Sequence, residues 1–337
     1  MSKGTVEALV WQPFELQMLD QRALPHETLY LSYTTAEGVA KGIKDMVVRG
    51  APLIGVTGAY GLMLALQEDP SDDALEAAFK QLNATRPTAV NLRWALKRIR
   101  DKVKPLQPAK RAEAARAESA LIAEEDVAMC EAIGNHGLAI IQKLAAGRPS
   151  VRQQEPIQVL THCNAGWLAT VDWGTALAPI YKAHRAGLNI HVWVDETRPR
   201  NQGASLTAYE LGREGVPHTV IVDNAGGHIM QQGEVDLMIT GTDRTTANGD
   251  VANKIGTYLK ALAAHDNDVP FYVGLPGPTI DWNLTSGKDI PIEERDTKEV
   301  TTVIGLTADG QIKAVKVTRE ASKAANYAID DTPARLV

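Results

Sequence analysis

Few cysteines and few aromatic residues occur in this sequence. Its 337 residues include only two cysteines, Cys130 and Cys163, and aromatic residues make up 5%. Two thiols are too few for a disulfide framework, which favours a reducing compartment. No apolar run reaches the roughly 20 residues that a membrane-spanning helix needs, and residues 1–16 show no signal-peptide pattern. We therefore expect a cytoplasmic protein that has no membrane partner.

Positive charge is also not in excess. Lys and Arg number 35 and Asp and Glu number 41, which gives a formal net charge of -6. This balance disfavours binding to nucleic acid, so any site for a phosphate must be local.

The sequence lacks several motifs that mark cofactor, metal or hydrolase sites. They are a G-x-G-x-x-G after a strand, H-E-x-x-H, paired C-x-x-C and G-x-S-x-G. We accordingly expect no metal, no cofactor and no hydrolase-type serine.

Hydrophobic residues make up 44% of the chain, which is enough to fill two cores at this length. A polar break from Gly147 to Glu155 interrupts the pattern. We expect an N-terminal domain over residues 1–147 and a catalytic domain over residues 155–337.

The N-terminal domain is predicted to be mostly helical after a short β-rich segment. Small-residue and amphipathic patterns at helical spacing follow Thr34 and continue to about residue 147. The expected strands are Ala8–Trp11, Glu15–Leu19 and Thr28–Leu31, and the expected helices begin at Thr34 and Pro52 and span Ala74–Leu82, Ala89–Val103 and Lys110–Leu144.

In the C-terminal domain, strands and helices alternate. This order predicts an α/β fold with a Rossmann-like parallel sheet. Ligands bind where the carboxyl ends of such strands converge. The expected strands are Ile157–Thr161, Ile190–Val194, His218–Val222, Leu237–Thr240 and Phe271–Leu275, with helices over Leu168–Ala186, Ser205–Glu214, Gly226–Gln232 and Ala252–His265 and later strands over Val300–Ile304 and Ile312–Val317.

Two arginines stand next to expected helix starts in the N-terminal domain. Arg49 precedes Gly50, Ala51 and Pro52, and Arg86 precedes another proline. A helix N-terminus beside an arginine is a common anion site. The alternative is a glycine required by packing, beside an arginine on the surface. The two arginines could form a phosphate clamp if the fold brings them together.

Polar residues follow two of the expected strands. Cys163 lies in a polar loop after Ile157–Thr161, where it is either a reactive thiol or an inert buried one. Asp243 follows Leu237–Thr240 and suits acid–base chemistry; alternatively it pairs with Arg244 or caps the next helix.

Two further groups of charged and polar residues are candidates. Asp195, Glu196 and Arg198 are either site residues or, as we favour, a structural ion cluster. Asn253 and Lys254 are expected near a helix start, where their side chains and the helix N-terminus could hold an anion together.

These motifs, taken together and in order along the chain, resemble those of the methylthioribose-1-phosphate isomerase family. The match spans nearly the whole sequence. The motifs are Arg49–Val56, Arg86–Leu92, Leu160–Gly166, Asp195–Pro199, Gly241–Arg244, Asn248–Tyr258 and Ile290–Arg295.

The resemblance implies interconversion of 5-methylthioribose 1-phosphate with its ketose in methionine salvage. It also implies a metal-free enzyme without a cofactor that forms a homodimer. By position, Asp243 would be the proton donor and Cys163 the second catalytic residue. The residues implied to bind substrate are Arg49, Gly50, Ala51, Arg86, Gln202, Asn253 and Lys254.

Some residues depart from the family's usual pattern. Trp167, Trp173 and Thr242 either reshape the pocket around the substituent at C5 or serve packing. A reshaped pocket would accept 5-deoxyribose 1-phosphate, alone or as a second substrate. Ribose 1,5-bisphosphate would need a further basic cluster. A non-catalytic regulatory subunit of the translation-initiation nucleotide-exchange factor is disfavoured because both Cys163 and Asp243 are present.

Overall fold

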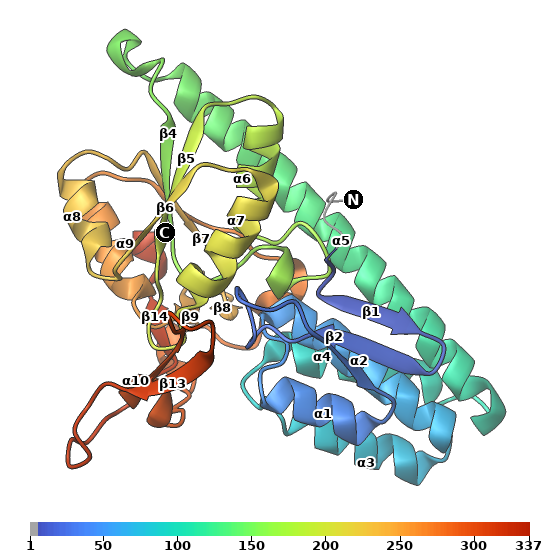
Figure 1. The fold of residues 1–337 in the computed structure, drawn as a ribbon. Coiled ribbons are helices and arrows are strands. Elements are labelled where there is room, and N and C mark those ends of the chain that lie inside the picture. Colours follow the sequence, from blue (N-terminus) through green and yellow to red (C-terminus); the bar gives the residue numbers. More distant parts are fainter. Residues whose placement is uncertain (1–5) are drawn as a thin grey trace.

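A computed structural model describes residues 6–337 and has an α/β fold with a parallel sheet and a helical N-terminal region (Figure 1). The chain begins with an antiparallel sheet of order β1-β2-β3. Helices then follow without intervening strands. These elements are β1 (Leu9–Gln12), β2 (Glu15–Leu19), β3 (Tyr30–Tyr33), α1 (Ala36–Lys44), α2 (Ala51–Glu68), α3 (Asp72–Asn83), α4 (Val90–Val103) and α5 (Pro108–Ala146).

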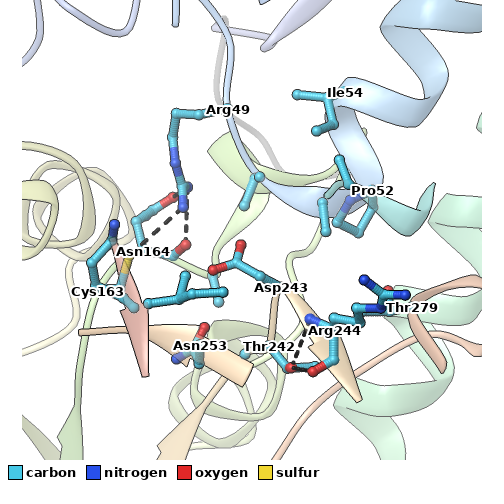
Figure 2. Close-up of a pocket in the computed structure, with 18 of the residues that line it drawn as sticks. Arg49, Pro52, Ile54, Cys163, Asn164, Thr242, Asp243, Arg244, Asn253 and Thr279 are labelled. Atoms are coloured by element: carbon cyan, nitrogen blue, oxygen red, sulfur yellow. Dashed lines mark hydrogen bonds between the residues drawn. The ribbon is translucent and has the colours of Figure 1, made fainter. Parts of the chain in front are cut away.

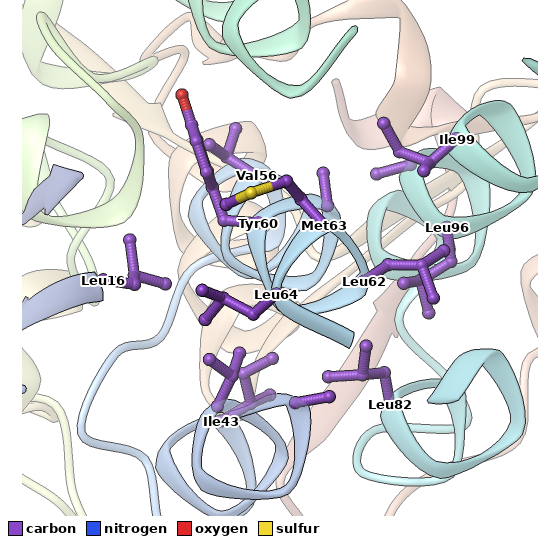
Figure 3. Close-up of a cluster of buried hydrophobic side chains, with 14 of the residues drawn as sticks. Leu16, Ile43, Val56, Tyr60, Leu62, Met63, Leu64, Leu82, Leu96 and Ile99 are labelled. Atoms are coloured by element: carbon purple, nitrogen blue, oxygen red, sulfur yellow. The ribbon is translucent and has the colours of Figure 1, made fainter. Parts of the chain in front are cut away.

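Helix α2 is the centre of the N-terminal region, since all its residues from Ala51 to Leu66 are buried. Helices α1, α3, α4 and α5 pack around it, and Figure 3 shows its leucine, methionine and tyrosine side chains meeting those of the neighbouring elements. A helix that is apolar on every side is stable only when it is enclosed. This burial fixes the N-terminus of α2, and therefore Arg49 and Gly50, relative to the rest of the chain.

Five parallel strands form the main sheet of the C-terminal region, in the order β10-β7-β4-β5-β6. Two hydrophobic clusters pack on the sheet together with the helices around it. The elements are β4 (Ile157–Thr161), α6 (Leu177–Arg185), β5 (Ile190–Asp195), α7 (Ala208–Glu214), β6 (His218–Ile221), α8 (Ala225–Gln231), β7 (Leu237–Thr240), α9 (Thr257–Asp266) and β10 (Phe271–Val273).

Helix α5 joins the two regions. It runs diagonally across the molecule (Figure 1), packing on α2 and α4 in one half and on α6 in the other. Ile141, near its C-terminal end, belongs to the same buried cluster as the strands β4 and β5. The two regions therefore share part of their core.

Smaller elements complete the C-terminal region. A four-stranded sheet has the order β11-β8-β9-β14, and a separate hairpin pairs β12 with β13. Among residues 6–337, no helix is both long and apolar enough to cross a bilayer. The remaining elements are β8 (Arg244–Thr246), β9 (Val251–Lys254), β11 (Ile280–Asp281), α10 (Lys298–Thr301), β12 (Thr302–Leu306), β13 (Ile312–Lys316) and β14 (Ile329–Thr332).

The largest differences from the predicted helices are the starts of α6 and α9. The helix expected over Leu168–Ala186 begins only at Leu177, because residues 170–176 form a loop in which Trp173 and Gly174 have positive φ. The helix expected over Ala252–His265 begins at Thr257, since residues 251–254 pair with β14. Both differences arise from tertiary contacts rather than from local helix preference.

Candidate active site

All nine residues proposed for the site line one pocket between the N-terminal region and the carboxyl ends of β4 and β7. Figure 2 shows side chains from both regions facing this hollow. The helix α2 contributes its N-terminus, and the sheet contributes the loops that follow its strands. The nine residues are Arg49, Gly50, Ala51, Arg86, Cys163, Gln202, Asp243, Asn253 and Lys254.

Cys163 is held in a strained backbone conformation at the end of β4. Its φ is 65°, in the left-handed region that only a few non-glycine residues adopt. Its N–H donates to Thr197 Oγ1 at 2.9 Å, and its carbonyl accepts from Thr207 Oγ1 at 2.7 Å. The thiol sulfur lies 3.7 Å from Arg49 Nη2 and 3.7 Å from Gln202 Oε1. The backbone strain thus directs the thiol into the pocket, beside a positive charge.

Arg49 is buried and bonded to the same loop. Its Nη1 donates to the Asn164 side-chain oxygen at 2.7 Å and to the Asn164 carbonyl at 2.9 Å. Its Nε is buried and has no hydrogen-bond partner within residues 6–337. The guanidinium therefore lies next to the thiol, and its orientation is set by the loop that carries the thiol.

Gly50 is required by both conformation and space. Its φ is 102°, and a Cβ at this position would lie 2.5 Å from the Ala169 Cα. The close contact with the site loop brings the first backbone N–H groups of α2 to the pocket, where they are available to an anion. The packing explanation and the anion explanation for this glycine are compatible.

Asp243 follows β7, and its backbone N–H donates to the Ala252 carbonyl at 3.0 Å. Figure 2 shows its carboxylate turned toward the side of the pocket where Cys163 and Asn164 lie. The alternative pairing with Arg244 is wrong, because the Arg244 guanidinium binds Asp281, with Nε 3.0 Å from the carboxylate. The carboxyl group of Asp243 is consequently directed into the site.

Lys254 and Asn253 lie on β9 rather than at the helix start that the sequence predicted. Lys254 Nζ donates to the Ala328 carbonyl at 2.9 Å, and Asn253 Nδ2 donates to Thr257 Oγ1 at 3.1 Å. Burial lowers the pKa of the Lys254 ammonium, while Cys163 and Asp243 act in the opposite direction. The strand pairing with β14 holds this lysine in the pocket wall.

Arg86 lies at the edge of a chain of alternating charges that the sequence motifs did not assign to the site. Its Nη2 is 3.6 Å from Glu293, which also binds Arg295 at 3.0 Å. Arg295 in turn binds Glu299, and Glu299 binds Arg200 at 2.8 Å. Burial lowers the pKa of the Arg86 guanidinium, and Glu293 is the main group opposing that effect. A phosphate that bound near Arg86 would meet a guanidinium whose charge is already partly balanced by Glu293.

Of the three residues in the predicted ion cluster, only Asp195 belongs to a buried cluster of charges within residues 6–337, because the Arg198 guanidinium donates instead to the Pro199 and Val300 carbonyls. The Asp195 Oδ2 lies 3.0 Å from His162 Nδ1 and 3.1 Å from Lys260 Nζ. Oxygen and nitrogen atoms of His162, Asp195 and Asp223 are close enough together to hold a metal ion. The Lys260 ammonium already supplies Asp195 with a positive charge.

Asn164, Thr197 and Glu210 support the site but were not proposed from the sequence. Asn164 and Thr197 lie within recognised motifs, so their role was accessible from position. Glu210 lies in the first turn of α7, where no pattern singled it out, yet it is fully buried.

The two unusual tryptophans are packed away from the pocket. Trp167 is 5% exposed and lies against Tyr209, at 6.4 Å between ring centroids. Trp173 is 8% exposed, and the Lys182 ammonium lies 4.1 Å from its ring centroid. Both side chains therefore serve packing and do not reshape the pocket around the C5 substituent of the substrate.

The pocket can support acid–base chemistry on an anionic substrate. A thiol and a carboxyl group face one hollow, and arginine, lysine and helix N–H groups surround them. Such donors stabilise negative charge that develops during a reaction.

Comparisons with known proteins identify the family of this chain. The model of the initiation factor 2 subunit family matches residues 47–337. Methylthioribose-1-phosphate isomerase of Methylocella silvestris is 60% identical over 323 residues, 96% of this chain and 87% of that protein. The one from Rhodospirillum rubrum is 60% identical over 340 residues, 99% of this chain and 87% of its own length.

Two solved structures are also similar over almost the full length. Crystalline 5-methylthioribose 1-phosphate isomerase from Pyrococcus horikoshii OT3 has a TM-score of 0.81 at 38% identity, covering 98% of this chain and 89% of that one. Translation initiation factor eIF-2B, subunit delta, from A. fulgidus has a TM-score of 0.78 at 35% identity, covering 99% and 93%. This chain therefore belongs to the initiation factor 2 subunit family and, within it, to the methylthioribose-1-phosphate isomerases.

Proposed function

We propose that this chain converts 5-methylthioribose 1-phosphate to 5-methylthioribulose 1-phosphate, a step of methionine salvage. The observation that carries the proposal is the shared pocket of Cys163 and Asp243, lined also by Arg49 and Lys254. Its relatives at 60% identity carry the name of this isomerase.

The first step is ring opening with Asp243 as the acid. A free aldose opens its ring through the anomeric hydroxyl, but a 1-phosphate blocks that route. Breaking the bond between C1 and the ring oxygen therefore needs a proton on the departing oxygen. The Asp243 carboxyl faces the hollow where the sugar would lie, and it is positioned to supply that proton.

The second step moves a proton from C2 to C1 through a cis-phosphoenolate. Cys163 acts in this step, either as the base that takes the C2 proton or as the group that stabilises the developing charge. Its thiol lies 3.7 Å from Arg49 Nη2, so the guanidinium is close to the place where negative charge would develop. A direct hydride shift from C2 to C1 is the competing route.

The phosphate binds at the N-terminus of α2. The N–H groups near Gly50 and Ala51, together with Arg49, Arg86 and Lys254, supply donors from two regions of the chain. Gln202 and Asn253 are placed to bind the sugar portion. Because the donors come from both regions, substrate would hold the two sides of the pocket together.

We also propose a Rossmann-like catalytic domain over residues 155–337 and an N-terminal domain over residues 1–147. The sheet order β10-β7-β4-β5-β6 supports the first, since the chain runs from β4 through β5 to β6 and then crosses to β7 on the other side of β4. A homodimer in the cytoplasm is proposed from the family resemblance, and sedimentation of the purified chain tests the dimer.

Removal of each catalytic group tests the function. Cys163→Ser and Asp243→Asn should each abolish conversion of 5-methylthioribose 1-phosphate, followed as ketose formation by NMR. Cys130→Ser is the matched control. This thiol, on α5, is buried against Trp173 and Ala178 and does not line the pocket. A well-folded Cys163→Ser or Asp243→Asn protein with wild-type turnover would contradict the proposal, as would an inactive wild type.

Isotopes and analogues refine the assignment. In deuterium oxide, the proton route puts deuterium at C1, whereas full transfer of a deuterium from C2 with no solvent label indicates hydride transfer.

A panel of methylthio-, deoxy- and phospho-substituted ribose 1-phosphates compares the alternative substrates. Burial of Trp167 and Trp173 outside the pocket leaves Thr242, which lines the pocket, as the one departure that could support a deoxy-specific pocket. We expect the methylthio compound to react with the highest kcat/KM.

A further inference from the structure

Glu210 on α7 is fully buried and accepts a complete set of hydrogen bonds from the site loop and α6. Its Oε1 accepts from Asn164 Nδ2 at 2.8 Å and from the Leu168 N–H at 3.0 Å. Its Oε2 accepts from the Trp167 N–H at 2.8 Å and from the Tyr181 hydroxyl at 2.6 Å. Each oxygen therefore receives two hydrogen bonds, one of them from a backbone N–H that can only donate. Both oxygens of the Glu210 side chain must accept.

The bond to Glu210 is the shorter of two that fix how Asn164 meets Arg49. An asparagine amide has one donating and one accepting side. Because Nδ2 donates to Glu210 Oε1 at 2.8 Å and to Thr207 Oγ1 at 3.2 Å, the oxygen must face Arg49 Nη1, which it does at 2.7 Å. With the amide reversed, two donors would face each other, and Arg49 would lose this bond.

Arg49 is in turn the cation beside Cys163. Its Nη2 lies 3.7 Å from the sulfur, and its Nη1 also binds the Asn164 carbonyl at 2.9 Å. The path from Glu210 to the thiol thus consists of direct contacts through Asn164 and Arg49. Glu210 itself is absent from the pocket wall formed by the described residues.

We propose that Glu210 is a positioning residue for the reaction, orienting the Asn164 amide so that Arg49 is held at the Cys163 thiol and the substrate phosphate. The close approach of the loop supports this: a Cβ on Gly166 would collide with the Glu210 carboxylate. Burial raises the pKa of the Glu210 carboxyl to about 7, and its hydrogen bonds counteract that rise. The chain retains a costly buried acid at a position where it specifies an orientation. This inference rests on the proposed isomerase function.

Glu210→Gln is the sharpest test because it keeps the size and changes only the donor and acceptor pattern. Either orientation of the glutamine amide sets its NH₂ against a backbone N–H, of Trp167 or of Leu168. We expect kcat/KM to fall at least about tenfold, as small misplacements in a site cost rate. The inhibition constant for inorganic phosphate should rise in parallel, because Arg49 is displaced.

Two controls separate positioning from stability. Leu211→Val alters a fully buried neighbour on α7; it should lower the melting temperature while kcat/KM of the folded protein stays at the wild-type value. In an Asn164→Ala background, Glu210→Gln should change kcat/KM by less than about twofold, because its route to Arg49 is gone. A purely structural role would give the same loss in both backgrounds.

The outcomes are distinct. Wild-type kcat/KM and phosphate inhibition in folded Glu210→Gln would overturn the positioning role and leave the isomerase function standing. If Glu210→Gln does not fold, Asn164→Ala decides: it should reproduce the expected loss, and wild-type kinetics would overturn the inference. An inactive wild type would instead sink the proposed function.

Discussion

Asp126, on α5, offers a stability measurement whose size follows from the structure. The residue is 4% exposed, and its Oδ2 accepts from the Val171 N–H at 2.8 Å. Burial raises the pKa of its carboxyl from 3.8 to about 7, and the Val171 bond only partly opposes this. A carboxyl that holds its proton more tightly when folded makes the folded state most stable when protonated. Its stabilising contribution is complete below pH 3.8 and is lost as pH rises through about 7.

We expect Asp126→Asn to become more stable relative to the wild type as pH rises. Asparagine can still accept from Val171 but has no charge to bury. Between pH 5 and pH 8, the difference in the free energy of unfolding should change by about 2.5 kcal/mol, from about 1.36 kcal/mol for each unit of pKa. Other titrating groups, including Glu210, cancel in this difference.

Urea unfolding at pH 5, 6, 7 and 8 measures the effect for the wild type, Asp126→Asn and the control Asp266→Asn. Asp266 is exposed at the end of α9, so the control should give a nearly pH-independent difference. A difference for Asp126→Asn that stays constant across this range would refute the reasoning, since the carboxyl would then titrate alike in both states.

Three further outcomes follow from the site and the core. Gly50→Ala should cost more than about 2 kcal/mol and raise KM, because a φ of 102° and the contact with Ala169 leave no room for a methyl group; thermal melting and kinetics test this. Lys254→Met should raise KM by about tenfold to a hundredfold through loss of a charged phosphate contact, whereas Lys110→Met, exposed on α5, should match the wild type. Tyr60→Phe should stabilise by about 1 kcal/mol in urea, because its buried hydroxyl finds no partner within residues 6–337; a destabilised variant would contradict that.

The sequence by itself determined the order along the chain of the strands in the main sheet, and the motifs. Short runs of aliphatic and β-branched residues predicted β4 and β7 with correct bounds, because such runs between polar loops leave few alternatives. Motif order was sufficient to name the residues that line the pocket. These properties are local, or they are repeated within the family, and so they can be read from one chain.

Tertiary structure alone decided what each residue contacts. Pairing with β14, more than 70 residues away, made residues 251–254 a strand and directed Lys254 at the pocket. The importance of Glu210 likewise depends on four donors brought from α6 and the Cys163 loop. Local propensity cannot encode such contacts, because the energies of burial and of hydrogen bonding are settled only when distant segments meet.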